Sequence, residues 1–151
     1  MTRVTTIAAF SGAGHPLGMI ALRPGDAVLD VGCGSGLDAL LAARAIGAAG
    51  RVSGVDMTPE VVQLARGAAR RVGARNVTLD VGVAERLPYP DGSFDVVLSN
   101  NVVNNCAVDK LAVLREMHRV LKPGGRLAIA DVMVAEPIPD DGRAEIGLWT
   151  C

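Results

Sequence analysis

The chain has 151 residues, half of them apolar and about a fifth charged, which is the composition of one globular domain with a sizeable core. Its net charge is −1 with acids and bases interspersed, so neither nucleic acid nor an anionic membrane is an expected partner. No apolar run approaches the roughly 20 residues that a bilayer requires, and the first residues lack a secretory signal. We therefore expect a cytoplasmic protein.

Short apolar runs alternate with helical patterns in the first half of the chain. The pattern predicts a strand at 27–31, a helix at 37–46, a strand at 51–56, a helix from Thr58 to Gly73 and a strand at 77–83. The second helix has a clear start, because Thr58 can cap it, Pro59 suits its first turn and Glu60 complements its dipole.

The second half continues the alternation. It predicts a strand at 94–99, a helix at 109–121 that is ended by the Pro-Gly-Gly at 123–125, and a nearly continuous apolar strand at 126–134. Strand–helix alternation of this kind is typical of an α/β doubly wound parallel sheet. We expect one domain over 1–151, made of a lead-in at 1–20, a cofactor-binding core at 21–134 and a C-terminal segment at 135–151.

A glycine-rich loop between the first strand and the first long helix carries the strongest chemical signal. It reads Asp30-Val-Gly-Cys-Gly-Ser-Gly36, and its candidate cofactor-binding residues are Asp30, Gly32, Cys33, Gly34 and Gly36. The glycines let the backbone turn tightly and let a ligand approach it closely. The helix that follows presents free N–H groups. Asp56 ends the second strand, where a carboxylate can accept both hydroxyls of a ribose. The combination predicts a nucleoside across the first two strand tips.

A nicotinamide dehydrogenase is the main alternative for such a loop. Its GxGxxG fingerprint would place the third glycine at position 37, which is Leu37 here. The spacing in this chain is GxGxG, and Asp30 stands two residues before the first glycine. A carboxylate at that place suits a ligand ammonium group, which the methionine part of S-adenosyl-L-methionine has and a dinucleotide lacks. The loop therefore favours S-adenosyl-L-methionine as the cofactor.

Several stretches carry a resemblance that covers nearly the whole chain. The glycine loop and Arg119-Val-Leu-Lys-Pro-Gly-Gly125 resemble those of class I S-adenosylmethionine-dependent methyltransferases. Val55-Asp-Met-Thr-Pro-Glu60 and the ending Trp149-Thr-Cys151 are similar, more narrowly, to the arsenite methyltransferases. The resemblance implies a Rossmann-like fold and methyl transfer to a small acceptor, for which the sulfonium of the cofactor already supplies the reactivity.

The resemblance also implies further cofactor contacts at the ends of the strands. Residues after the second strand would hold the ribose and flank the adenine, those after the third would line the adenine pocket, and those ending the fourth would lie beneath the sulfonium. The residues that this adds are Met57, Ala84, Glu85, Ser99 and Asn100. The loop at 101–108 would face the methyl acceptor.

The positions of the cysteines test which methyl acceptor the resemblance implies. Arsenic(III) is a thiophilic centre, and the arsenite methyltransferases bind it with three cysteine thiolates. The matching positions here hold Ala13, Asn101 and Cys151, while Cys106 lies in the predicted acceptor loop. The candidate acceptor-side residues are therefore Cys151, Cys106 and Asn101. We expect a small-molecule or metalloid substrate, with a carbon, oxygen or nitrogen acceptor as the alternative to arsenite.

The position at which the sequence ends, compared with its relatives, affects how many strands we expect in the sheet. Relatives continue past the Trp-Thr-Cys position into two further strands, so we expect the sheet to lack its last strands. The fifth strand would then be an uncovered edge, which favours aggregation or a homodimer. A truncated cofactor-binding module without turnover is the second functional hypothesis, and cofactor affinity without methylated product would distinguish it from an enzyme.

Overall fold

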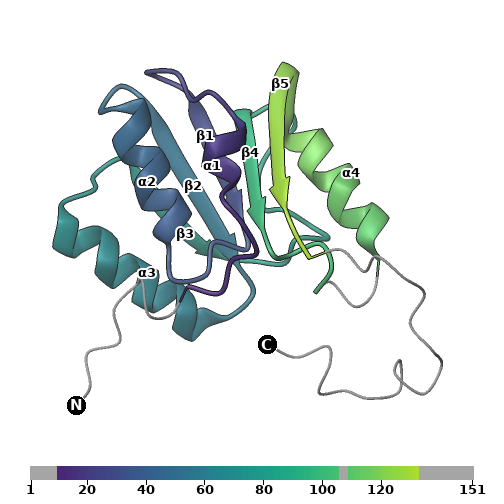
Figure 1. The fold of residues 1–151 in the computed structure, drawn as a ribbon, viewed down its shortest axis with the longest axis horizontal. Helices are drawn as coiled ribbons and strands as arrows, with labels where there is room; N and C mark the ends of the chain where they lie inside the picture. The colour runs from purple at the N-terminus through teal and green to yellow at the C-terminus, as the bar shows by residue number, and fades with distance from the viewer. Residues whose placement is uncertain (1–9, 106–108, 133–151) are drawn as a thin grey trace.

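The computed structural model describes residues 10–105 and 109–132, which form a five-stranded parallel sheet flanked by helices (Figure 1). The strands are β1 Ala27–Val31, β2 Arg51–Asp56, β3 Val77–Val81, β4 Phe94–Asn100 and β5 Leu121–Ala130. The helices are α1 Pro16–Met19, α2 Leu37–Ile46, α3 Pro59–Val72 and α4 Lys110–Val120. The strand order is β3-β2-β1-β4-β5, so the chain reverses its direction of travel across the sheet at β1. Ligands bind at such a reversal in open α/β sheets.

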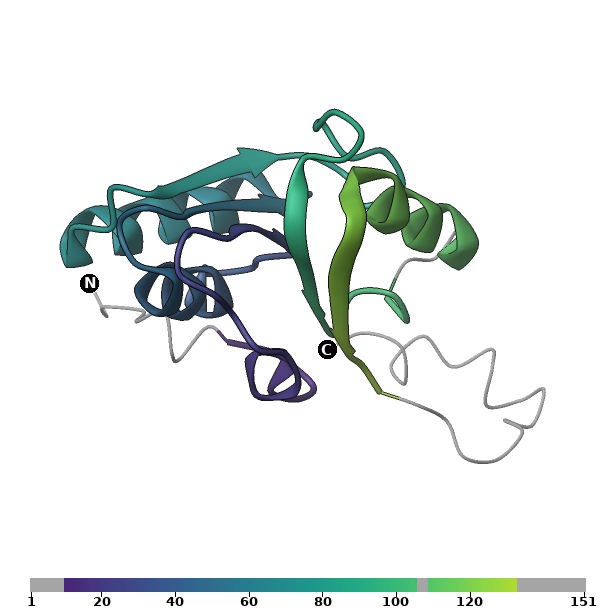
Figure 2. The same ribbon diagram turned by 90° about the horizontal axis from the view of Figure 1, so that it is seen from above.

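Helices cover both faces of the sheet (Figure 2). The buried residues of α2 and α3 pack in one cluster with one face of the strands, and those of α4 pack in a second cluster with the other face. β1 contributes to both, because Val28 belongs to the first cluster and its neighbours Ala27 and Leu29 belong to the second. Every residue of β1 is buried, as expected of a central parallel strand.

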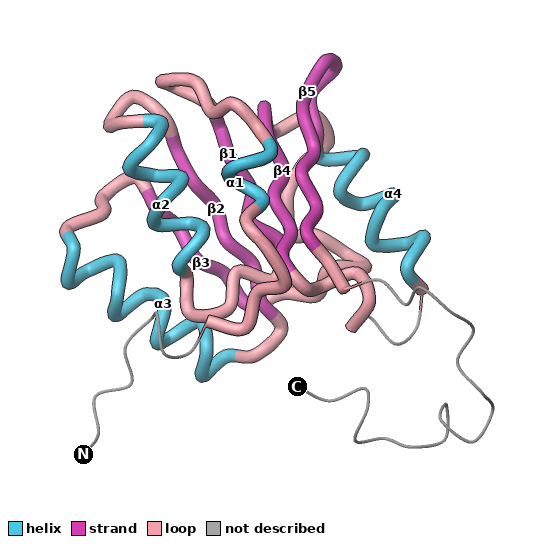
Figure 3. Tube along the Cα trace, in the orientation of Figure 1, coloured by secondary structure: helices cyan, strands magenta, loops and turns pink. Residues whose placement is uncertain are grey.

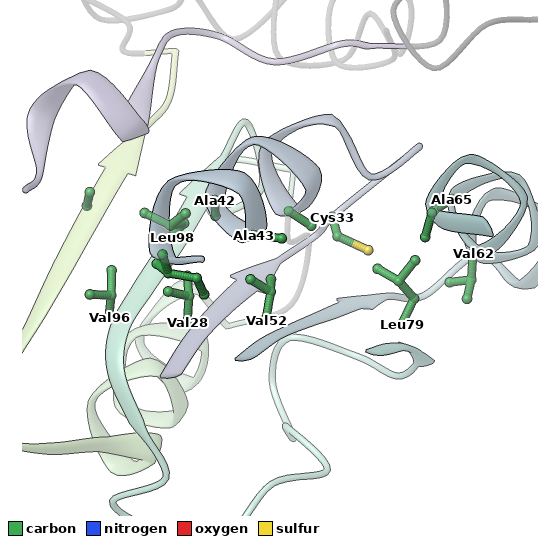
Figure 4. Close-up of a cluster of buried hydrophobic side chains, with 14 residues drawn as sticks. Val28, Cys33, Ala42, Ala43, Val52, Val62, Ala65, Leu79, Val96 and Leu98 are labelled. Carbon is green, nitrogen blue, oxygen red and sulfur yellow. The ribbon is translucent and has the colours of Figure 1, made fainter. Parts of the chain in front are cut away.

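Small side chains bring α2 close to the sheet. Ala39, Ala42 and Ala43 are buried against Val28 and Val52 in the cluster that Figure 4 shows. α3 begins with Pro59 and ends at Val72, and it is capped by Gly73, which has a left-handed backbone and donates its N–H to carbonyl oxygens of the last turn. The scarcity of aromatic residues is thus met by close packing of Ala, Val and Leu.

The predicted fold class is confirmed, while several strand boundaries differ from prediction. β3 ends at Val81 and not at 83, and Val83 forms an isolated antiparallel bridge to Arg86 instead. β5 starts five residues early, because Leu121 already pairs with Phe94 while the next pairing joins Arg126 to Val96. The Pro-Gly-Gly at 123–125 is therefore accommodated in a bulge of the strand and does not end the helix, which stops at Val120.

The far end of β5 is also shorter than predicted. The strand ends at Ala130, so positions 131 and 132 of the predicted strand lie beyond it and positions 133–134 lie outside the described residues. In the described part of the chain β5 pairs with β4 alone. None of the helices in residues 10–105 and 109–132 is long and apolar enough to cross a membrane.

Candidate cofactor site

The loops that follow β1, β2 and β4 gather at the carboxyl edge of the sheet (Figure 3). Two adjoining cavities open there, one of about 460 Å³ and one of about 40 Å³. Ser11, Gly32, Gly34 and Asn100 line both of them. The larger cavity extends over the ends of β2 and β3, and the smaller one lies between the glycine loop and the start of α2.

Backbone hydrogen bonds tie the glycine loop to the end of β2. The N–H groups of Gly32 and Cys33 both donate to the carbonyl oxygen of Val55, at 2.8 and 3.0 Å. Gly34 has a φ of +51° and a Cβ placed on it would meet no atom within 4 Å, so its open side faces the cavities. Gly36 has a different role, because a Cβ there would lie 3.0 Å from the Cβ of Ala65 on α3. Gly34 leaves room for a ligand, whereas Gly36 leaves room for a helix.

The Asp56 carboxylate is anchored where β2 ends. Its Oδ2 accepts a hydrogen bond from the N–H of Gly34 at 3.0 Å, and its Oδ1 accepts one from the N–H of Thr58 at 3.0 Å. The side chain is half-buried and lines the larger cavity next to Met57, which is 72% exposed. Because each carboxylate oxygen can accept a second hydrogen bond, Asp56 keeps capacity for ligand hydroxyls.

The other predicted adenine-side residues lie across the same cavity. Ala84 and Glu85 follow β3 and line the larger cavity together with Gly82 and Val83. The chain from 82 to 93 is held from the α4 side, since Glu116 accepts a hydrogen bond from the N–H of Leu87 at 2.7 Å. The cavity is therefore walled by the ends of two strands and by a connection that α4 anchors.

Asp30 is a buried carboxylate at the end of β1. It is only 2% exposed, lines the smaller cavity, and its Oδ2 has no hydrogen-bond partner among the described residues. Burial and the nearby charge of Asp38 raise the pKa of Asp30 well above its ordinary value. A buried acceptor without a partner is costly, and a cationic ligand group in the cavity would remove that cost. These residues fit the amino-acid end of S-adenosyl-L-methionine.

The end of β4 holds the N-terminal residues against the site. Asn100 lines both cavities, and Asn101, whose φ is +60°, lines the larger one. The side-chain amide of Asn101 donates to the carbonyl oxygen of Ser11 at 3.0 Å. Asn105 also lines the larger cavity, and its side chain donates to the carbonyl oxygen of Asn101 at 2.8 Å. This side of the larger cavity is therefore rich in carboxamides.

Other predicted site residues lie elsewhere. Ser99 is fully buried with a hydroxyl that has no partner among the described residues, and it lines neither cavity; nor does Gly36. Cys33 lines the smaller cavity, but Figure 4 shows its sulfur pointing toward Leu79 in the buried cluster. Burial, followed by the charge of Asp30, raises the pKa of the Cys33 thiol and so keeps it neutral. The predicted acceptor residues Cys106 and Cys151 lie outside the described residues.

Sequence reasoning missed five residues that line the smaller cavity, namely Phe10, Ser11, Gly12, Ser35 and Asp38. Asp38 carried a signal, because an acid in the first turn of a helix that follows a glycine loop lies next to the ligand site. Ser11 carried none, since it is held at the site by a hydrogen bond from Asn101, 90 positions away.

Comparisons with known proteins agree with this geometry. Residues 22–147 match the family model described as a methyltransferase domain. The arsenite methyltransferase of Halobacterium salinarum is 47% identical over 130 residues, which are 86% of this chain and 33% of that protein. The demethylmenaquinone methyltransferase of Listeria welshimeri is 40% identical over 113 residues, 75% of this chain and 48% of that protein.

A solved structure is similar over almost the whole chain. The arsenic (III) S-adenosylmethionine methyltransferase of Chlamydomonas reinhardtii superposes with a TM-score of 0.83 and 39% identity, covering 95% of this chain and 50% of that one. The chain thus spans a third to a half of the length of these relatives. Because the family match extends over most of the chain, this protein belongs to the methyltransferase-domain family, and over that length it is similar to arsenite methyltransferases.

Proposed function

We propose that the chain binds S-adenosyl-L-methionine across the two cavities and transfers its methyl group to a small acceptor. The observation that carries this proposal is the buried Asp30 carboxylate, with one unpartnered oxygen, beside the open Gly34 and the anchored Asp56. A ligand that satisfies all three needs a cationic amino-acid end and a ribose. The family to which the chain belongs supports the same cofactor.

Each wall of the site has its own part in binding. Asp56 accepts hydrogen bonds from the ribose hydroxyls, and Met57, Ala84 and Glu85 enclose the adenine in the larger cavity. Asp30 accepts from the ammonium group in the smaller cavity. When bound, the cofactor supplies an activated methyl group, so the chain has to hold the acceptor in line with that group and keep water away.

Calorimetric titration with S-adenosylhomocysteine, the product form of the cofactor, tests this proposal. We expect saturable binding at one site and none for NADH under the same conditions. NADH tests the role of the amino-acid end, because it has a ribose and an adenine but no ammonium group for Asp30. Binding of NADH without binding of S-adenosylhomocysteine would mean that the glycine loop belongs to a different cofactor class.

For the acceptor we propose trivalent arsenic, on the strength of the similarity to arsenite methyltransferases. Asn101 stands at a position where those proteins have a cysteine, so at most Cys106 and Cys151 supply thiolates. Thiols from solution would complete the three sulfur ligands that arsenic(III) prefers. We expect arsenite methylation that is slow, depends on added thiol, and disappears in Cys151→Ser.

A second acceptor class is favoured by one feature of the site. The carboxamides of Asn101 and Asn105 line the acceptor-facing wall, and such groups position oxygen and nitrogen acceptors by hydrogen bonds. A screen with methyl-labelled cofactor over arsenite, thiols and small metabolites separates the two classes. Methylation of an oxygen, nitrogen or carbon acceptor that Cys151→Ser leaves unchanged would contradict the arsenic proposal and leave methyl transfer standing. Cofactor affinity without any labelled product would favour a binding module without turnover.

A further inference from the structure

Residues 10–14, here called the strap, lie against the carboxyl edge of the sheet. Figure 1 shows this purple segment leaving α1 and running past the ends of the central strands. Phe10, Ser11 and Gly12 form part of the wall of the smaller cavity, opposite the glycine loop. The strap therefore covers the part of the site where the cofactor's amino-acid end is proposed to bind.

Two side chains at the carboxyl end of β4 hold the strap in place. Asn101 donates to the carbonyl oxygen of Ser11, and Asn100 makes the larger number of these hydrogen bonds. Oδ1 of Asn100 accepts hydrogen bonds from the N–H groups of Ala13 and Gly14, at 2.8 and 3.2 Å. Its Nδ2 donates to the carbonyl oxygen of Gly14 at 3.0 Å and to Oδ2 of Asp38 at 2.9 Å. A carboxamide has two donor hydrogens and two acceptor lone pairs. All four are used here, so the orientation of the amide is determined by its partners.

The fourth of these bonds links the strap to a second acid in the cavity. Asp38 is 6% exposed, stands in the first turn of α2, and lines the smaller cavity together with Asp30. Oδ2 of Asp30 has no hydrogen-bond partner among the described residues, whereas Oδ2 of Asp38 is held by Asn100. Two buried carboxylates that face one small cavity repel each other. A cation bound between them would be attracted to both carboxylates and would offset their repulsion.

We propose that Asn100 is a positioning residue for the cofactor's ammonium group, because it orients Asp38 beside Asp30 and at the same time clasps the strap over the cavity that the two acids share. The inference rests on the proposed function, since it takes S-adenosyl-L-methionine as the ligand. It assigns to Asp38 a direct contact with the ammonium group and to the strap the exclusion of water from that contact. Asn100 itself acts through Asp38 and the strap.

The strap packs so closely on Asn100 that a steric substitution in the strap can test this contact separately from the charges. A Cβ placed on Gly12 would lie 2.5 Å from Nδ2 of Asn100 and 2.3 Å from the ring of Phe10. Gly12→Ala therefore displaces either the strap or the amide without removing any polar group. Asp38→Asn makes the opposite change, because it removes the charge and leaves the hydrogen bonds between Asn100 and the strap in place.

The experiment compares two ligands that differ only at the amino-acid end. S-adenosylhomocysteine has the ammonium group, whereas 5′-methylthioadenosine has the same adenosine and sulfur without it. We expect Asn100→Ala and Asp38→Asn to lower the affinity for S-adenosylhomocysteine at least tenfold and to change that for methylthioadenosine less than twofold. Gly12→Ala should produce the same selective loss. The matched control is Asn76→Ala, which removes an amide that also bridges backbone carbonyls, at Gly47 and Gly50, away from the cavities.

Hydrogen exchange at the strap separates the two roles of the amide. The N–H groups of Ala13 and Gly14 should lose protection in Asn100→Ala and keep it in Asp38→Asn. If the wild-type chain binds S-adenosylhomocysteine but Asn100→Ala weakens both ligands equally, or neither, Asn100 is a structural residue and the inference is wrong. If Asn100→Ala does not fold, the same comparison in Asp38→Asn and Gly12→Ala decides the question. A wild-type chain that binds no S-adenosylhomocysteine would instead overturn the proposed function.

Discussion

Arg119 on α4 is a half-buried ionisable side chain and Asp30 at the end of β1 is a buried one, yet their surroundings differ completely. Arg119 forms ion pairs with Glu116 at 2.6 Å and Asp91 at 2.7 Å and also donates to the carbonyl oxygens of Leu87 and Tyr89. Asp30 is more deeply buried, has another acid as its neighbour, and keeps one oxygen without a partner among the described residues.

The difference separates a region that stabilises the fold from one that is available for a ligand. The Arg119 network is complete in the free protein, so it holds the connection from 82 to 93 against α4. At the carboxyl edge of the sheet, burial and a neighbouring acid make the ionised form of Asp30 unfavourable, and either protonation or a bound cation relieves this cost. Four substitutions test this contrast.

The largest effect is expected for Gly34→Val. The branched side chain would occupy the open side of the loop, where the ligand approaches, and we expect no binding of S-adenosylhomocysteine at concentrations that saturate the wild type. Gly92→Val is the matched control, because Gly92 has a similar φ of +60° and open space but lies away from the cavities. Equal loss of binding in both variants would mean that backbone strain is responsible, and not the filling of the open space beside residue 34.

In the stabilising region, Arg119→Ala should lower the free energy of unfolding by about 2–4 kcal/mol, because it leaves Glu116 and two carbonyl oxygens without their partner. Urea unfolding measures this loss. Arg115→Ala, an exposed arginine on the same helix, should change stability by less than about 0.5 kcal/mol. We expect cofactor binding to fall less than stability does, and similar stabilities of the two variants would contradict the assignment.

At the carboxyl edge, Asp56→Ala should weaken S-adenosylhomocysteine binding by about 1.5–3 kcal/mol, the scale of hydrogen bonds to a charged acceptor. Calorimetry at constant pH gives this difference directly. Because Asp56 also accepts from the backbone of Gly34 and Thr58, Asp56→Asn is the informative companion: it keeps an acceptor oxygen and should lose less affinity. Affinity equal to that of the wild type in both variants would remove Asp56 from the site.

The smallest effect, and the one with opposite sign, is expected for Asp30→Asn. Because burial raises the pKa of Asp30, this side chain loses its proton less readily in the folded chain than in the unfolded chain. At neutral pH this difference lowers stability, and the amide should raise the free energy of unfolding by about 1 kcal/mol. The gain should shrink as the pH falls through the raised folded-state pKa and vanish below about pH 4, the ordinary pKa of an aspartic acid. Binding of S-adenosylhomocysteine should weaken in the same variant.

Asp95→Asn is the control for the sign of this change in the free energy of unfolding. Hydrogen bonds from Lys122 lower the pKa of Asp95, so its ionised form stabilises the folded chain above the ordinary pKa of an aspartic acid, and that contribution is lost as the pH falls through the lowered value. Its amide should therefore destabilise the chain at neutral pH. Unfolding curves at pH 4, 5 and 7 compare the two variants, and destabilisation by Asp30→Asn at pH 7 would contradict the contrast between the regions.

The sequence by itself determined the order and type of most elements and the place of the glycine loop. These features depend on local patterns: an apolar run, a helical period, Thr58-Pro59-Glu60 at a helix start, and three glycines between a strand and a helix. The position of Asp56 beside the glycine loop could be predicted in the same way, because parallel strands bring their carboxyl ends to one edge and an acid at the end of the second strand then lies near the loop that follows the first.

Only the tertiary structure decided which polar groups have partners. The bulge in β5 follows from pairing with β4, and the inward direction of the Cys33 sulfur follows from packing between β3 and α3. The four hydrogen bonds of Asn100 join it to Asp38, 62 positions away, and to Ala13 and Gly14, 87 and 86 positions away. Contacts at such separations leave no local period in a single sequence, because they depend on the arrangement of whole elements and not on the neighbours of each residue.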